Sequence, residues 1–101
     1  MISVDENLIA MAKLTHHPRI TTDAFDSEIE SILQAGLLDL TISGVVVPDE
    51  DNALVTRALM TYFQLHFGEP DDPDRLLASY EMQKSQMITA TGYTDWGRVN
   101  G

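Results

Sequence analysis

The chain of 101 residues contains no cysteine. This absence excludes disulfide bonds and thiolate metal sites, so packing or assembly has to hold the protein together.

Long apolar runs are missing too, since none approaches the roughly 18 to 20 residues that span a membrane. The opening stretch MISVDENLIAMAKL carries two acids and lacks the basic start and continuous apolar block of a signal peptide. We therefore expect synthesis in the cytoplasm and no membrane partner.

Basic residues are scarce. The chain has six Lys and Arg residues and 16 Asp and Glu residues, which gives a formal net charge of -10. Because nucleic-acid affinity comes mainly from Lys and Arg that displace counterions from phosphate, tight DNA binding is not expected. The charge leaves three roles open: an ordinary solubilising surface, a DNA mimic, or a wall that DNA passes without sticking.

Apolar residues recur at three- and four-residue steps, a spacing that predicts helices. We expect an all-α fold, a small bundle of four helices at about residues 3–14, 23–43, 52–67 and 72–89. These form one helical domain over residues 1–90, followed by a flexible C-terminal tail over residues 91–101. A domain of this length has a modest core, to which a partner could add stability.

Start and stop signals flank these helices. Ser3 and Glu6 have the spacing of a capping box, and Pro73 suits the first position of the last helix. Gly44 and Gly68 are typical residues at which a helix ends. The caps expected for the other three helices are Thr22 or Asp23, Asp51 or Asn52, and Asp71 or Asp72. The intervening stretch VVVPDED is predicted to be an extended loop, because Pro48 argues against a strand.

The periodicity also predicts which residues face the core. In the second helix the inner stripe is Phe25, Ile29, Ile32, Leu33, Gly36 and Leu40, widened by Leu37 and Leu38. In the third helix it is Val55, Ala58, Leu59, Tyr62, Phe63 and His66. In the fourth it is Leu76, Leu77, Tyr80, Lys84 and Met87, with the Lys84 charge reaching solvent.

The acidic stretch HFGEPDDPDRLLASYE, residues 66–81, raises the question of a metal site. A calcium loop that began at Asp72 would place Leu76 where an oxygen ligand is needed, so the spacing excludes an EF-hand. Helix capping explains most of these acids instead. His16, His17 and His66 lack the spacing of metal ligands, and neither a nucleophile motif nor a glycine-rich phosphate loop is present. We expect no enzyme, and therefore no catalytic, cofactor-binding or metal-binding residues.

Residues that the helical pattern leaves unused are candidates for partner contacts. Exposed Trp and Tyr often anchor interfaces, although the tail could equally fold back over its own domain. The candidate docking residues are Tyr93, Trp96, Arg98, Val46, Val47 and Asp49. The candidate subunit-interface residues are Phe63, Phe67, Arg57 and Arg75, and for the two phenylalanines a place in the core is the favoured reading.

The order of the pieces between Leu54 and Met87 resembles the head-tail connector proteins, or head-completion adaptors, of tailed bacteriophages and prophages. Members show an aromatic-rich helix end followed by FG, a short joint that ends in DDP, and a helix carrying SYE and a lysine. Upstream, DLTISGV at residues 39–45 resembles the close of the family's second helix. The matching residues are Phe67-Gly68, Asp71-Asp72-Pro73, Ser79-Tyr80-Glu81 and Lys84.

The resemblance covers about residues 1–90 and implies a structural virion protein without catalysis or cofactors. Such a protein assembles in the host cytoplasm into a homo-oligomeric ring, with a dodecamer among the candidate sizes. The ring lies at the head-tail junction between the portal protein and the tail or stopper (head-closure) protein. It completes the head and extends the channel through which DNA passes, without specific binding, in packaging and ejection.

Two other classes remain. The charge of -10 fits a small acidic binding module, such as a DNA mimic or regulator, that occupies the basic surface of a partner. A weaker alternative is a metal-binding or hydrolytic domain built on the Asp-rich joint.

Overall fold

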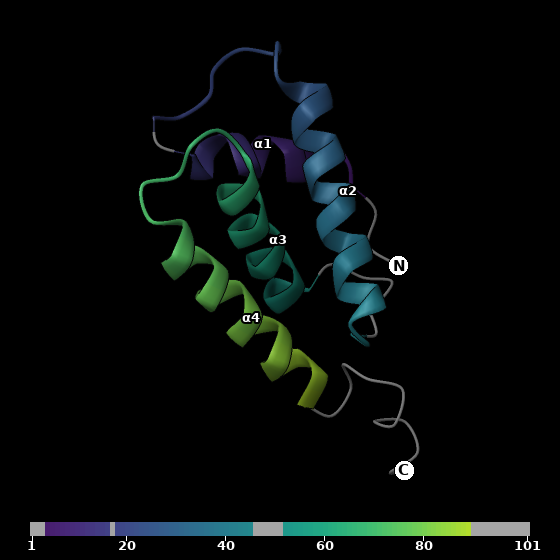
Figure 1. The fold of residues 1–101 in the computed structure, drawn as a ribbon. Coiled ribbons are helices and arrows are strands. Elements are labelled where there is room, and N and C mark those ends of the chain that lie inside the picture. The colour runs from purple at the N-terminus through teal and green to yellow at the C-terminus, as the bar shows by residue number, and fades with distance from the viewer. Residues whose placement is uncertain (1–3, 17, 46–51, 90–101) are drawn as a thin grey trace.

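The computed structural model describes residues 4–16, 18–45 and 52–89, and these residues form four helices and no strand (Figure 1). The helices are α1 (Glu6–Thr15), α2 (Asp26–Ile42), α3 (Ala53–His66) and α4 (Pro73–Thr89). The all-α prediction is confirmed, with bounds within three residues of those expected. In the described part of the chain, no helix is both long and apolar enough to cross a bilayer.

Helix α3 lies between α2 and α4 and contacts both, while α1 crosses near one end of the bundle and packs against α2 and α3 (Figure 1). This order follows from composition, because α3 has the broadest apolar face and can support a neighbour on each side. Its Val55, Ala58, Leu59 and Phe63 are fully buried. They meet Ile29, Leu33 and Leu40 of α2 and Met87 of α4 in one continuous core.

The helix starts agree with the sequence at α3 and α4. Asn52 accepts hydrogen bonds from the amides of Leu54 (3.0 Å) and Val55 (3.2 Å). Asp72 accepts one from the amide of Arg75 (3.1 Å), directly before Pro73 at the first helical position. The expected stops are present as well, since Gly44 (φ 103°) and Gly68 (φ 66°) both adopt positive φ.

The predicted starts of the first two helices differ from the structure. Helix α1 is capped by Asp5, which accepts from the Leu8 amide (3.0 Å), and Ser3 lies outside the described residues. Helix α2 begins at Asp26 with no side-chain cap. The proposed cap at Asp23 was wrong because its carboxylate pairs with Lys13 (3.2 Å) and its carbonyl accepts from the Asp26 amide in a turn.

Some inner-face predictions were also wrong. Leu38 is 60% exposed and Leu77 47% exposed, because each lies to one side of the stripe that its helix buries against α3. His66 is exposed at the end of α3.

The loop and tail residues proposed for docking lie outside the described residues, as does most of VVVPDED. These residues are Val46, Val47, Asp49, Tyr93, Trp96 and Arg98.

Candidate functional site

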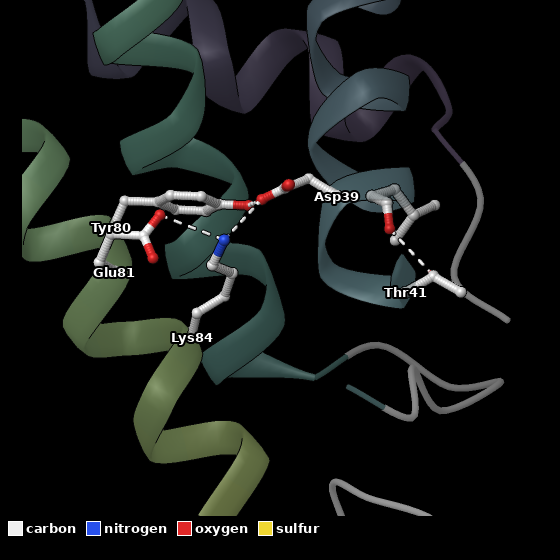
Figure 2. Close-up of polar contacts among 6 residues, drawn as sticks. Asp39, Thr41, Tyr80, Glu81 and Lys84 are labelled. Carbon is white, nitrogen blue, oxygen red and sulfur yellow. Dashed lines mark hydrogen bonds and ion pairs between the residues drawn. The ribbon is translucent and has the colours of Figure 1, made fainter. Parts of the chain in front are cut away.

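A polar cluster joins α2 to α4 across α3 (Figure 2). The Tyr80 hydroxyl donates a hydrogen bond to Asp39 Oδ2 at 2.5 Å, and Lys84 Nζ donates to the same oxygen at 3.0 Å. Lys84 also pairs with Glu81 at 3.2 Å. The expectation that the Lys84 charge reaches solvent was wrong, because its side chain is only 13% exposed and its ammonium is held between two carboxylates.

The cluster shifts the ionisation of each member. Burial works to raise the pKa of Asp39, but the hydrogen bonds from Tyr80 and Lys84 and the Lys84 charge outweigh it and lower the pKa. Burial works to lower the pKa of Lys84, yet its bonds to Asp39 and Glu81 raise it. Burial, followed by the bond to Asp39, raises the pKa of Tyr80 strongly. The cluster therefore stays fully charged on Asp39 and Lys84, with Tyr80 neutral, across the physiological range.

This cluster holds α2 and α4 in a fixed relative position, and its groups are not arranged for acid–base or nucleophilic catalysis. One oxygen of Asp39 accepts two bonds, and Tyr80 is held as a neutral donor, so neither is poised as a base or nucleophile. The bonds from Tyr80 and Lys84 to Asp39 form a tie between α2 and α4, and each joins residues that are 41 or 45 positions apart in the chain. It fixes the outer helix α4 to α2 independently of their shared contacts with α3.

The acidic elbow between α3 and α4 forms a hollow of about 280 Å³ lined by Glu69, Asp71, Asp72 and His16, among others. Asp72 is occupied by its capping bond and by Arg75 at 3.4 Å. Residues 4–16, 18–45 and 52–89 contain no group of three or more His, Asp or Glu placed to hold a metal ion. At this elbow Gly68 ends α3 with a positive φ and Asp72 caps α4, so these residues form the joint between the two helices.

Aromatic rings support the elbow from inside. The Phe67 ring stacks on Phe63 (centroids 4.9 Å apart) and meets the edges of His16 (5.2 Å) and Phe25 (5.7 Å). Phe63 is fully buried and Phe67 is 9% exposed. The core reading of these two residues is confirmed, and within the described fold neither offers a surface to a second subunit.

The two arginines named as interface candidates line the same groove. Arg57 of α3 and Arg75 of α4 line one groove of about 340 Å³ between these helices, beside Met11 of α1. Both arginine side chains are exposed. The apolar floor of the groove includes Met60 and Leu76. The groove thus concentrates positive charge and apolar surface in a protein that is otherwise strongly acidic.

Sequence reasoning named every member of the polar cluster but did not predict that they meet. Asp39 and the segment Ser79-Tyr80-Glu81 were separate parts of the family resemblance. A usable signal was present: Asp39 is an acid beside the apolar stripe of α2, while Tyr80 and Lys84 are four residues apart on the inner face of α4. The pairing of α2 with α4 itself cannot be read from a single sequence.

Comparisons with protein-family models, curated proteins and solved structures find no match to this chain. Any functional assignment therefore depends on the residues and their arrangement.

Proposed function

We propose that this protein is a structural virion assembly protein of the head-tail connector kind, a subunit of a ring between the capsid portal and the tail or stopper protein. The ring extends the DNA channel and completes the head. The protein is assembled in the cytoplasm of the bacterial host and has no catalytic role.

One observation supports the proposal most strongly. The residues on which the resemblance rests are far apart in sequence, yet Asp39, Tyr80, Glu81 and Lys84 form one connected cluster. The FG and DDP pieces lie at the joint between α3 and α4, where Gly68 ends one helix and Pro73 begins the next. The matching residues thus hold the joint between α3 and α4 and the link between α2 and α4. Residues with these structural roles are expected to recur in proteins that share one fold.

The charge and size of the chain fit this role. Acidic surface on a channel wall would let DNA slide, since cationic walls would hold it through phosphate contacts. A domain of 101 residues with a modest core gains buried surface when identical neighbours close into a ring.

The test is assembly and partner binding. We expect the purified full chain to form rings at high concentration, seen by sedimentation velocity and negative-stain microscopy, and to be retained by immobilised portal protein from the same phage or prophage. A strict monomer that portal protein does not retain would refute the proposal.

The second candidate is an acidic binding module that occupies the basic groove of a partner, favoured by the charge of -10. It predicts one-to-one binding to a basic protein, weakened by salt, with saturation and no ring. Affinity that is independent of ionic strength would exclude it.

A further inference from the structure

The few cations of this protein are unevenly distributed. In the described structure, Lys13 pairs with Asp23 and Asp26, and Lys84 pairs with Asp39 and Glu81. Arg57 has no carboxylate partner among the residues described, and Arg75 has only the exposed contact with Asp72 at 3.4 Å. Two of the three described arginines therefore line a single groove, and both are exposed.

This groove extends along α3. It runs along α3 from Asn52 to Gln64, because a second hollow of about 450 Å³ between α1 and α3 shares Met11, Thr56 and Arg57 with the first. At 1.5 Å per residue this stretch of α3 is roughly 18 Å long. Among the described residues that line that end, Asp5 is the one carboxylate, and it is occupied as the cap of α1. The groove also holds Gln83, whose buried Oε1 has no hydrogen-bond partner in the described structure.

The outer face of α2 has the complementary chemistry. Helix α2 contains no basic residue. Of its four acids, Asp26 and Asp39 pair with Lys13 and Lys84, while Glu28 and Glu30 are exposed. Successive residues of a helix are about 100° apart, so Leu38 and Ile42 lie roughly 140° and 180° around α2 from the buried Leu33. They are 60% and 75% exposed. Between them and the exposed Glu28, this face carries Ser31, an exposed hydrogen-bond donor.

The two surfaces also match in length and position. From Glu28 to Ile42 the outer face of α2 is roughly 21 Å long at 1.5 Å per residue, close to the length of the groove. Helix α3 lies between α2 and α4 (Figure 1), and no described residue that lines the groove belongs to α2, so one molecule can present both surfaces.

We infer that the groove between α1, α3 and α4 binds the outer face of α2 of a second copy of this chain. Leu38 and Ile42 pack on Met11, Met60 and Leu76, while the arginines of the groove meet Glu28, the exposed acid on that face of the incoming helix. The contact joins two different surfaces, so it is head-to-tail: each bound copy leaves one groove and one α2 face free, and the series ends only when a ring closes. This inference rests on the proposed function and identifies the surfaces that would build its ring.

The experiment uses two variants of the full chain. Arg57→Glu disables the groove, and Leu38→Gln with Ile42→Gln disables the α2 face. All three positions are exposed, so the fold should be retained, which circular dichroism and melting would verify. Arg19→Glu, also at an exposed position but outside the groove, is the control for charge, and Leu77→Gln is the control for lost apolar surface.

In sedimentation velocity across a concentration series, we expect wild type and both controls to self-associate beyond the dimer. Each disabled variant should associate roughly tenfold or more weakly. An equal mixture of the two disabled variants should form a dimer and stop there, because only one intact groove and one intact α2 face can meet.

The outcomes separate this inference from the proposed function. Wild-type rings that persist in both variants, as in the controls, would overturn the inference and leave the connector role standing. Association that follows the variants as expected, in a protein that portal does not retain, would support the inference and refute the connector role. A wild-type chain that stays monomeric at millimolar concentration would overturn both.

Discussion

At Gly36 the packing of α2 against α3 leaves no room for a side chain. A Cβ atom there would lie 2.9 Å from Tyr62 Cδ1 and 3.2 Å from Leu59 Cδ2. Glycine in a helix interior costs about 1 kcal/mol relative to alanine, so the close approach must compensate for that cost. Gly36 was predicted to lie on the inner stripe, but its contact with a ring on another helix could not be predicted from the sequence.

We therefore expect Gly36→Ala to destabilise the protein. Steric strain of about 1 to 3 kcal/mol should outweigh the gain in helix propensity and lower the melting temperature by several degrees. Gln34→Ala, at an exposed position of the same helix, should leave the melting temperature unchanged or raise it slightly. A higher melting temperature for Gly36→Ala would show that the Tyr62 ring gives way freely.

Tyr80 offers a second substitution with a matched control. Tyr80→Phe removes the hydroxyl that donates to Asp39 and should cost about 1 to 2 kcal/mol in the free energy of unfolding. Tyr62→Phe also removes a partly buried hydroxyl, but one for which no hydrogen bond is seen in the described residues, so it should cost much less. Urea denaturation measures both, and equal costs would mean that the tie between α2 and α4 contributes little.

The lowered pKa of Asp39 predicts a pH dependence of the same tie. A carboxylate whose pKa is lower in the folded state contributes stability above its unfolded pKa, here 3.8, and loses it as pH falls through the folded value. Wild type should therefore exceed Asp39→Asn in stability by a constant margin above about pH 5, and that margin should shrink as pH falls below about 4. Glu30→Gln on the same helix is the control. A margin that is unchanged at acid pH would contradict the prediction.

For the helices, the sequence predicts which segments form and how long they are better than it predicts which of their residues face the core. Helices α3 and α4 begin at the predicted caps because Asn52 and Asp72 act within a few residues of themselves. Leu38 and Leu77 were misassigned because local periodicity does not tell how wide a stripe the neighbouring helix will cover. The meeting of Asp39 with Tyr80 depends on tertiary packing over 41 residues, which periodicity does not encode.

The cap of α3 can be tested as an element. Asn52 satisfies two amides at the start of the central helix, so Asn52→Ala should cost about 1 kcal/mol. Asn52→Asp keeps an acceptor and places negative charge near the positive end of the helix dipole, and should retain wild-type stability. Thermal melts compare the two, and an equal loss in both would show that the amide nitrogen of Asn52 matters more than its oxygen.

For the whole molecule, the dominant quantity is the net charge of -10. Folding brings these charges closer together, and the same repulsion opposes contact between subunits. The proposed contact of the groove of Arg57 and Arg75 with α2 of a second copy is one way in which an acidic chain can still self-associate.

This repulsion predicts that salt stabilises the monomer. Raising ionic strength from 0.01 M to 1 M shortens the screening length from about 30 Å to about 3 Å, which weakens long-range repulsion more than the close contacts of Lys13 and Lys84. We expect the melting temperature, measured at low protein concentration to avoid association, to rise by several degrees with sodium chloride. Arg19→Glu removes one positive and adds one negative charge, which makes the net charge of -10 two units more negative, and should respond more steeply. A melting temperature that falls with salt would instead mean that the ion pairs contribute more to stability than the repulsion costs. Repulsion between acidic surfaces would then not be the factor that limits assembly.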